Sequence, residues 1–171
     1  KYPNISTTRD FNDFLKDPKI DALAIATPAK THFSIAKRCL DAGKSVLIEK
    51  PFVTDSKEAR ELIDLAKKKK LILMVGHTFL YNPVVRVLKK YIEEKVLGDI
   101  YYIHSIRVNL GQVRRDVNAL WNFAPHDISI IIYLLNELPN SVSVKGKRVL
   151  QKDIEDLGFM DLDFNNNVTA H

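Results

Sequence analysis

Apolar residues in the first half of the chain form short continuous runs, and between these runs they recur at helical spacing. The runs lie within residues 21–28, 45–51 and 71–77, and the helical pattern covers residues 31–43 and 56–70. Continuous apolar strands joined by helices of this length are typical of parallel strands buried on both faces. The pattern therefore predicts an α/β fold with a doubly wound parallel sheet.

The second half follows a different pattern. A helix is expected to begin at Pro83 and end at Gly98, and a strand with one wetter face follows over residues 99–110. A further helix is expected to carry Pro125 in its first turn, because isoleucine and leucine recur at helical spacing after it. Three consecutive strands, hence a mainly antiparallel sheet, are predicted within residues 141–150, 155–164 and 167–171.

Composition excludes several classes of protein. With 171 residues and 46% hydrophobic content the chain can bury a core, so disorder is not expected. Its net charge of +5 comes from dispersed residues, and the one dense block, residues 67–70, closes a predicted helix. Cations there complement the helix dipole, and no aromatic residues interleave with them. A solvated helix end is therefore favoured over a nucleic-acid patch.

The cysteine and histidine content argues against disulfides, metal sites and catalytic triads in this chain. The single cysteine, Cys39, can form no disulfide within the chain, which fits a reducing cytoplasm, and we expect it in the core. No membrane-length apolar run and no basic-then-apolar leader occur, so no membrane partner is expected. The five histidines lack metal-ligand spacing, and no serine or cysteine triad pattern is present.

Polar residues follow each of the three predicted parallel strands. Residues 27–28 are Thr-Pro, residues 49–51 are Glu-Lys-Pro, and residues 76–77 are Gly-His. Sheets of this kind bind ligands outside the carboxyl ends of their strands. We therefore expect these three segments to line one crevice.

Three stretches carry a family resemblance, and they are, in chain order, AIATPAKTHFSIAKRCLDAGKSVLIEKPF, VGHTFLYNPVVRVLKKYI and WNFAPHDISII. They closely resemble the glucose-fructose oxidoreductase / inositol dehydrogenase (Gfo/Idh/MocA) family of NAD(P)-dependent oxidoreductases. The resemblance covers nearly the whole chain, and Glu-Lys-Pro at residues 49–51 is its most specific element.

The resemblance implies a chain that holds parts of two domains. Family members begin with a GxGxxG turn that binds the cofactor pyrophosphate, and no such motif occurs here, so we expect an internal fragment. Residues 1–82 would then be the C-terminal part of a Rossmann-type doubly wound sheet. Residues 83–171 would be part of a substrate-binding α+β domain with a mainly antiparallel sheet.

The resemblance also implies hydride transfer between NAD or NADP and a secondary alcohol of a sugar, a sugar nucleotide or a cyclic polyol. A positive group is needed near the developing alkoxide, and Lys50 fits this role because a partly desolvated lysine has a lowered pKa. Glu49 is expected to hydrogen-bond the nicotinamide ribose, and Pro51, whose peptide bond could be cis, to aim Lys50. Without the resemblance, a surface Glu-Lys pair is an equal alternative.

His126 is the candidate base. With Pro125 in a first helical turn, His126 would lie at the positive end of the helix dipole, which favours a neutral ring. Asn122, the third catalytic candidate, stands where family members usually carry Asp, and it can orient the ring by hydrogen bonding. The alternative is a histidine that caps or packs at a helix start. Asp127 is expected to interact with the helix N-terminus.

The remaining cofactor candidates are Thr27, Pro28, His32 and Trp121, which the resemblance places around the nicotinamide nucleotide together with residues 49–51. His32 taken alone would be interpreted as a surface residue at a helix start. Trp121 fits a wall of the site and a core position equally.

Substrate contacts are expected from the connection between the domains and from His126. The connection offers the donors and acceptors of His77, Tyr81 and Asn82. Arg114 and Arg115 are either phosphate contacts or solvated loop charges.

A rival function remains open, namely a non-catalytic protein that senses a nucleotide or a sugar. Asn122 and Leu80 depart from the family pattern, and a fold does not dictate a function. In either case we expect a homo-oligomer that forms through the antiparallel sheet.

Overall fold

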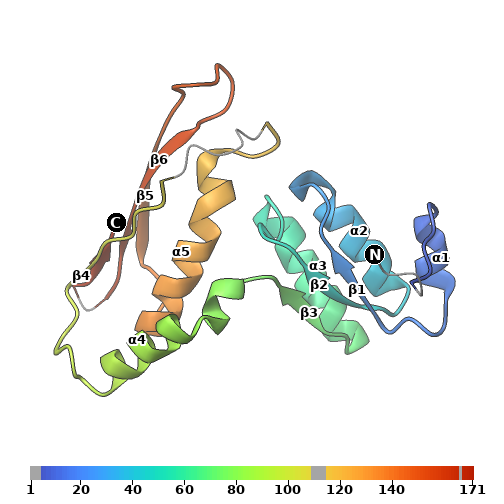
Figure 1. Ribbon diagram of the computed structural model, residues 1–171, viewed down its shortest axis with the longest axis horizontal. Helices are drawn as coiled ribbons and strands as arrows, with labels where there is room; N and C mark the ends of the chain where they lie inside the picture. The colour runs from blue at the N-terminus through green and yellow to red at the C-terminus, as the bar shows by residue number, and fades with distance from the viewer. Residues whose placement is uncertain (1–4, 109–114, 166) are drawn as a thin grey trace. The chain divides into compact units, whose positions relative to one another are not determined.

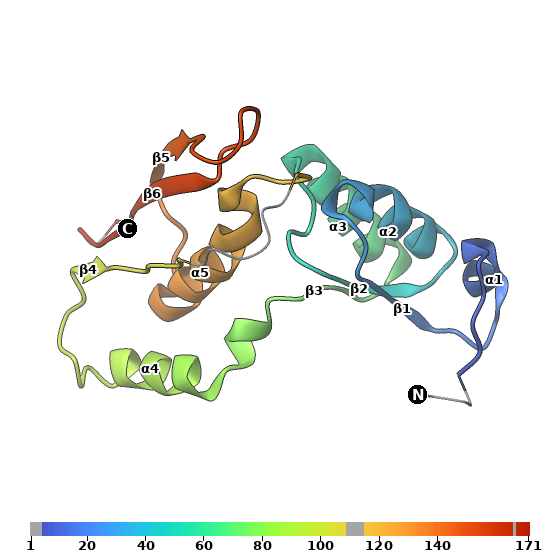
Figure 2. The same cartoon turned by 45° about the horizontal axis from the view of Figure 1, so that its top comes forward.

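The computed structural model describes residues 5–108, 115–165 and 167–171. The chain divides into two compact units, Lys1–Gly76 and His77–His171, and each unit has its own sheet (Figures 1 and 2). Within the described ranges, no helix is both long enough and apolar enough to cross a membrane.

The first unit is a parallel sheet with helices over one face (Figure 1). Its strands are β1 (Ala22–Ile25), β2 (Ser45–Ile48) and β3 (Leu73–Val75), in the order β1-β2-β3. Helix α2 (His32–Asp41) connects β1 to β2, and α3 (Ser56–Lys69) connects β2 to β3. The short helices are α1 (Phe11–Lys16) before β1 and η1 (Ala29–Thr31) before α2. The predicted α/β fold with a parallel sheet is confirmed.

The core of this unit lies between β2 and the two long helices. Ile48 is fully buried and belongs to the same cluster as Cys39 of α2 and Leu62 of α3. The predicted core position of Cys39 is confirmed, and burial raises the pKa of its thiol to about 11. On the opposite face, Leu47 and Met74 keep 44% and 40% of their surface exposed. The expectation of burial on both faces is therefore wrong for the described residues, because α2 and α3 cover only one.

Helix α3 is capped as its sequence suggests. The carboxylate of Asp55 accepts hydrogen bonds from the backbone amides of Lys57 and Glu58. The helix ends at Lys69, its C-cap residue Lys70 takes the left-handed conformation, and the lysines of the last turn are exposed. The lysine block is thus the solvated helix end that the sequence predicted.

The second unit packs its longest helix against a four-stranded mixed sheet (Figure 2). Its strands are β4 (Tyr102–Ile103), β5 (Ser141–Lys147), β6 (Leu157–Asp163) and β7 (Thr169–Ala170), in the order β4-β7-β6-β5. Its helices are η2 (Thr78–Tyr81), α4 (Pro83–Glu93) and α5 (Ala119–Leu135). Only β4 and β7 run parallel to each other, so the prediction of a mainly antiparallel sheet is confirmed.

Three elements differ from the sequence prediction. Helix α4 begins at Pro83 as predicted but ends at Glu93 and not at Gly98. Helix α5 begins at Ala119, where the side chain of Asn118 accepts a hydrogen bond from the Trp121 amide, so Pro125 lies inside the helix and not in its first turn. Within the described part of the predicted strand 99–110, β4 has two residues, which pair with Thr169 and Ala170 of β7, and residues 109 and 110 lie outside the described residues.

Candidate functional site

The carboxyl ends of the parallel strands meet at one edge of the first sheet, as predicted. The amide of Glu49 donates to the carbonyl of Ile25 at 2.9 Å, and the amide of Gly76 donates to the carbonyl of Ile48 at 2.8 Å. A Cβ atom placed on Gly76 would lie 3.3 Å from a carboxylate oxygen of Glu49. The missing side chain of Gly76 therefore makes room for the Glu49 carboxylate beside the end of β3.

Lys50 and Pro51 follow Glu49 at this edge. The backbone amide of Lys50 lies 3.3 Å from a carboxylate oxygen of Glu49, and the Lys50–Pro51 peptide bond is cis. Lys50 is half-buried and Pro51 is buried. Half-burial fits the partly desolvated lysine that the sequence predicted for this position.

His32 ties two strand ends together. Its Nδ1 lies 2.8 Å from the carbonyl oxygen of Pro51, and its Nε2 lies 2.8 Å from the carbonyl oxygen of Thr27. Its exposed fraction is only 1%, so the interpretation of His32 as a surface residue is wrong. Both partners are carbonyl oxygens, which only accept, and the ring donates to both when each nitrogen carries a proton. The ring thus links the segment after β1 to the segment after β2.

Thr27 and Pro28 lie at the exposed rim of this unit. The hydroxyl groups of Thr27 and Thr31 lie 2.7 Å apart, and the Thr31 hydroxyl donates to the carbonyl of Pro28. These bonds fix the turn between β1 and η1. The structure therefore gathers six of the cofactor candidates at one edge of the first sheet, and these are Thr27, Pro28, His32, Glu49, Lys50 and Pro51.

His126 lies in the middle of α5 in the second unit. Its ring meets the ring of Phe79, from η2, edge to face with the centroids 4.7 Å apart. Its position inside the helix overturns the argument that the dipole at a helix N-terminus keeps this ring neutral. Asn122 lies one helical turn before His126, which is the spacing of side chains on one helix face.

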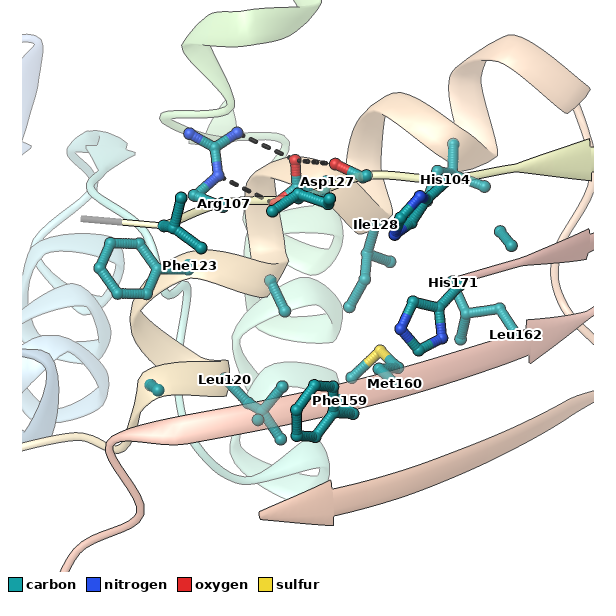
Figure 3. Close-up of a pocket in the computed structure, with 18 of the residues that line it drawn as sticks. His104, Arg107, Leu120, Phe123, Asp127, Ile128, Phe159, Met160, Leu162 and His171 are labelled. Carbon is teal, nitrogen blue, oxygen red and sulfur yellow. Dashed lines mark hydrogen bonds and ion pairs between the residues drawn. The ribbon is translucent and has the colours of Figure 1, made fainter. Parts of the chain in front are cut away.

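Asp127, next to His126, is held by two residues that follow β4. The guanidinium of Arg107 donates twice to its carboxylate, each bond 2.9 Å long, and the Ser105 hydroxyl donates at 3.0 Å (Figure 3). Burial acts to raise the pKa of Asp127, but the hydrogen bonds from Arg107 and Ser105 outweigh it, and the pKa is lowered. The expectation that Asp127 interacts with the helix N-terminus is therefore wrong.

His77 follows Gly76 and precedes η2. Its side chain is half-buried, and burial lowers the pKa of its imidazole. Its Nδ1 is buried and has no hydrogen-bond partner among the residues with assigned positions. A neutral ring with a free nitrogen can accept a hydrogen bond from a ligand hydroxyl. In the same described part of the chain, no group of three histidine, cysteine, aspartate or glutamate side chains could hold a metal ion.

The other candidates serve mainly as helix ends or lie at the surface. The Asn82 side chain accepts a hydrogen bond from the Val84 amide and caps α4, while Tyr81 is exposed. Trp121 lies in the first turn of α5 with 42% of its surface exposed, which argues against a core position. Arg115 is exposed, and Arg114 lies outside the described residues.

A cavity of about 480 Å³ opens in the second unit beside Asp127 (Figure 3). Its walls come from α5, from residues 104–108 after β4 and from residues 156–160 of β6 and its approach. Strand β7 pairs with β6 only at Leu162 and Asp163, so among the described strands the rest of this β6 edge has no partner. The cavity lies between α5 on one side and the strands and residues 104–108 on the other, and His126 is not among its lining residues.

Sequence reasoning missed Phe79, Ser105 and Arg107, all of which lie around His126 and Asp127. Ser105 and Arg107 were within the predicted strand 99–110, where alternation places residues two apart on the same face. That spacing offered a signal for a polar pair. No pattern in the sequence connected this pair to Asp127, which lies 20 residues after Arg107.

Comparison with known proteins identifies the family to which the chain belongs. Residues 1–77 match the family model described as "Oxidoreductase family, NAD-binding Rossmann fold", and residues 85–171 match the "GFO/IDH/MocA C-terminal domain". The levoglucosan dehydrogenase of Pseudarthrobacter phenanthrenivorans is 36% identical over 145 residues, with 77% of this chain and 37% of that protein covered. The UDP-N-acetylglucosamine 3-dehydrogenase of Acidithiobacillus ferrooxidans is 29% identical over 154 residues, with 90% of this chain and 48% of that protein covered.

A solved structure of a dehydrogenase is also similar to this chain. A levoglucosan dehydrogenase in complex with NADH and levoglucosan matches with a TM-score of 0.82 and 26% identity, with 95% of this chain and 50% of that chain covered. The chain thus spans about half the length of the relatives it matches, or less. The two family models match successive parts of the chain, and together they cover nearly all of its residues. The chain belongs to the GFO/IDH/MocA family of oxidoreductases.

Proposed function

We propose that the protein containing this chain transfers hydride between a nicotinamide cofactor, NAD or NADP, and a secondary alcohol of a sugar, a sugar nucleotide or a cyclic polyol. The observation that carries this proposal is the edge of the first sheet, where Glu49, Lys50 and Pro51 follow β2 and His32 ties them to the end of β1. The family membership and the named sugar substrates of two relatives support it.

The residues at the sheet edge suit cofactor binding. Gly76 leaves space for the Glu49 carboxylate, and Glu49 is exposed, so its carboxylate oxygens can accept hydrogen bonds from ribose hydroxyls. Thr27, Pro28, His32 and Pro51 form the adjoining wall, and Trp121 is proposed as a further contact. A bound nicotinamide supplies the hydride acceptor or donor, which no side chain can provide.

Lys50 and His126 are proposed to act on the same substrate hydroxyl. The ammonium group of half-buried Lys50 stabilises negative charge on the substrate oxygen, and His126 takes the hydroxyl proton. Asn122, one helical turn before His126, orients the ring. His77, Tyr81 and Asn82 are proposed to bind the remaining hydroxyl groups, with the buried Nδ1 of His77 as an acceptor.

Two further expectations stay predictions. A homo-oligomer through the second sheet fits strand β5, whose residues are all exposed. A reducing, cytoplasmic compartment fits the free and buried Cys39.

The full-length protein should be tested for a change in nicotinamide absorbance with a panel of sugars, sugar nucleotides and polyols. We expect turnover with at least one of them. Lys50→Ala should lower kcat by ~10²-fold or more, the scale expected for loss of one group that stabilises developing charge. Lys67→Ala, an exposed lysine in the last turn of α3, is the matched control and should leave kcat unchanged.

The rival sensor function predicts a different outcome. In that case the protein would bind a nucleotide or a sugar tightly in a titration, without turnover of any substrate in the panel. Turnover that is unaffected by Lys50→Ala would contradict the role of this lysine but leave the reaction class intact.

A further inference from the structure

We propose that Arg107 is a positioning residue that holds the His126 ring in place for proton transfer. This inference rests on the proposed function, in which His126 takes the substrate proton. It concerns a residue that sequence reasoning did not single out, and it follows from the contacts that Arg107 makes with two different neighbours of His126.

The first contact is a two-point ion pair with Asp127, the residue directly after His126. Arg107 Nε lies 2.9 Å from Asp127 Oδ2, and Arg107 Nη2 lies 2.9 Å from Asp127 Oδ1. Parallel bonds of this kind fix the angle between guanidinium and carboxylate as well as their distance. Ser105 adds a third bond, so the carboxylate has little freedom to rotate. Both charged groups are largely shielded from solvent, with 29% and 19% of their side chains exposed.

The second contact is with Phe79, which packs against the His126 ring. The guanidinium carbon of Arg107 lies 5.0 Å from the centroid of the Phe79 ring, within the range of a cation–π interaction. Phe79 in turn meets His126 edge to face, with an angle of 67° between the rings. Arg107 therefore restrains His126 from two sides, through the backbone at Asp127 and through the ring of Phe79.

A proline interrupts the hydrogen bonding of α5 next to His126. Pro125 lies inside α5, immediately before His126, and it has no N–H to donate to the preceding helical turn. A missing helical bond allows the local backbone to bend, so the direction of the next side chain depends on tertiary contacts. The Arg107–Asp127 pair supplies a tertiary contact one residue after the proline.

A purely structural role for Arg107 makes different predictions. It would alter stability, and it would change kcat only through the amount of folded enzyme. A positioning role predicts a lower kcat in fully folded enzyme, with a nearly unchanged KM for the cofactor, because a misplaced base slows only the chemical step.

The test uses the full-length enzyme with a substrate that it turns over. Arg107→Ala should lower kcat by ~10- to 100-fold, and Arg107→Lys should lower it less, because lysine keeps the charge but not the two-point geometry. The isotope effect with substrate deuterated at the reacting carbon should increase, since chemistry becomes slower than product release. Arg148→Ala removes another arginine–carboxylate pair of the same unit, that with Glu155, and should leave kcat unchanged.

A double-mutant cycle decides whether Arg107 acts through His126. Starting from His126→Ala, the further change Arg107→Ala should have no additional effect on kcat, because the base it positions is gone. Independent effects that multiply would overturn the inference while leaving the proposed reaction in place. Absence of turnover by the unmutated enzyme would overturn the proposed function, and this inference with it.

An NMR measurement that does not depend on catalysis can separate misplacement of the His126 ring from misfolding of a variant. Because the centroids of the Phe79 and His126 rings lie 4.7 Å apart, we expect the ring current of Phe79 to shift the His126 ring resonances in proton NMR. Arg107→Lys should move these resonances, whereas Arg148→Ala should not. Unchanged His126 resonances in a folded Arg107→Lys protein would count against the inference, whatever the kinetics show.

Discussion

At the residue scale, His32 connects the two strand ends that form the candidate cofactor edge of the first sheet. His32 is buried and contacts the carbonyl oxygens of Thr27 and Pro51, which come from the ends of two different strands. Buried carbonyl groups that lose a donor carry a desolvation cost. His32 therefore holds together the backbone segments that carry the candidate cofactor contacts.

Replacement of this histidine should cost stability. We expect His32→Ala to lower the free energy of unfolding by roughly 2–4 kcal/mol, because it creates a cavity and removes the ring that contacts two carbonyl oxygens. The measurement is denaturant unfolding of the protein, with Lys30→Ala, an exposed neighbour, as the control. A His32→Ala variant as stable as the control would show that the two contacts contribute little.

A second residue prediction concerns acid stability. The pKa of Asp127 is lowered in the folded state, so its ion pair stabilises the protein above the unfolded value of about 3.9, and this contribution is lost as the pH falls through the folded value. Asp127→Asn should therefore be less stable than the unmutated protein at neutral pH. The difference should shrink in acid, and unfolding curves measured at a series of pH values check this. A difference independent of pH would contradict the ion-pair account.

At the level of elements, long periodic segments were predictable and interrupted ones were not. Helix α3 could be placed from its spacing and its lysine-rich end because local chemistry and tertiary packing agree there. Helix α5 could not, because Pro125 usually marks a first turn, whereas here packing against β6 and the Asn118 cap extend the helix backwards. The position of His126 in this helix, and so its environment, depended on that boundary.

The cap of α5 provides a direct check of the boundary. Asn118→Ala should lower the free energy of unfolding by ~1 kcal/mol, the usual loss for an N-cap residue whose side chain accepts a backbone N–H. The same measurement on Asp55→Ala, which removes the cap of α3, gives the reference value. A helix that began at Pro125 would make Asn118→Ala neutral.

At the level of the whole molecule, the sequence predicted the candidate site better in the first unit than in the second. The candidate edge of the first unit could be foreseen because Glu-Lys-Pro, Thr-Pro and Gly-His end three parallel strands, and parallel strands align their carboxyl ends. The surroundings of His126 could not, because Phe79, Arg107 and Asp127 come from three separate segments and only folding brings them together.

Isotope tracing in the full-length protein can show whether hydride passes from a sugar-type alcohol to a nicotinamide. The protein is incubated with oxidised cofactor and an alcohol substrate deuterated at the reacting carbon, and the cofactor is then analysed by mass spectrometry. We expect the unmutated protein to form reduced cofactor that carries one deuterium, and Lys50→Ala to form almost no deuterated cofactor in the same time. Oxidation of the substrate without deuterium in the cofactor, or no oxidation of any alcohol in the panel, would rule out the proposed hydride transfer.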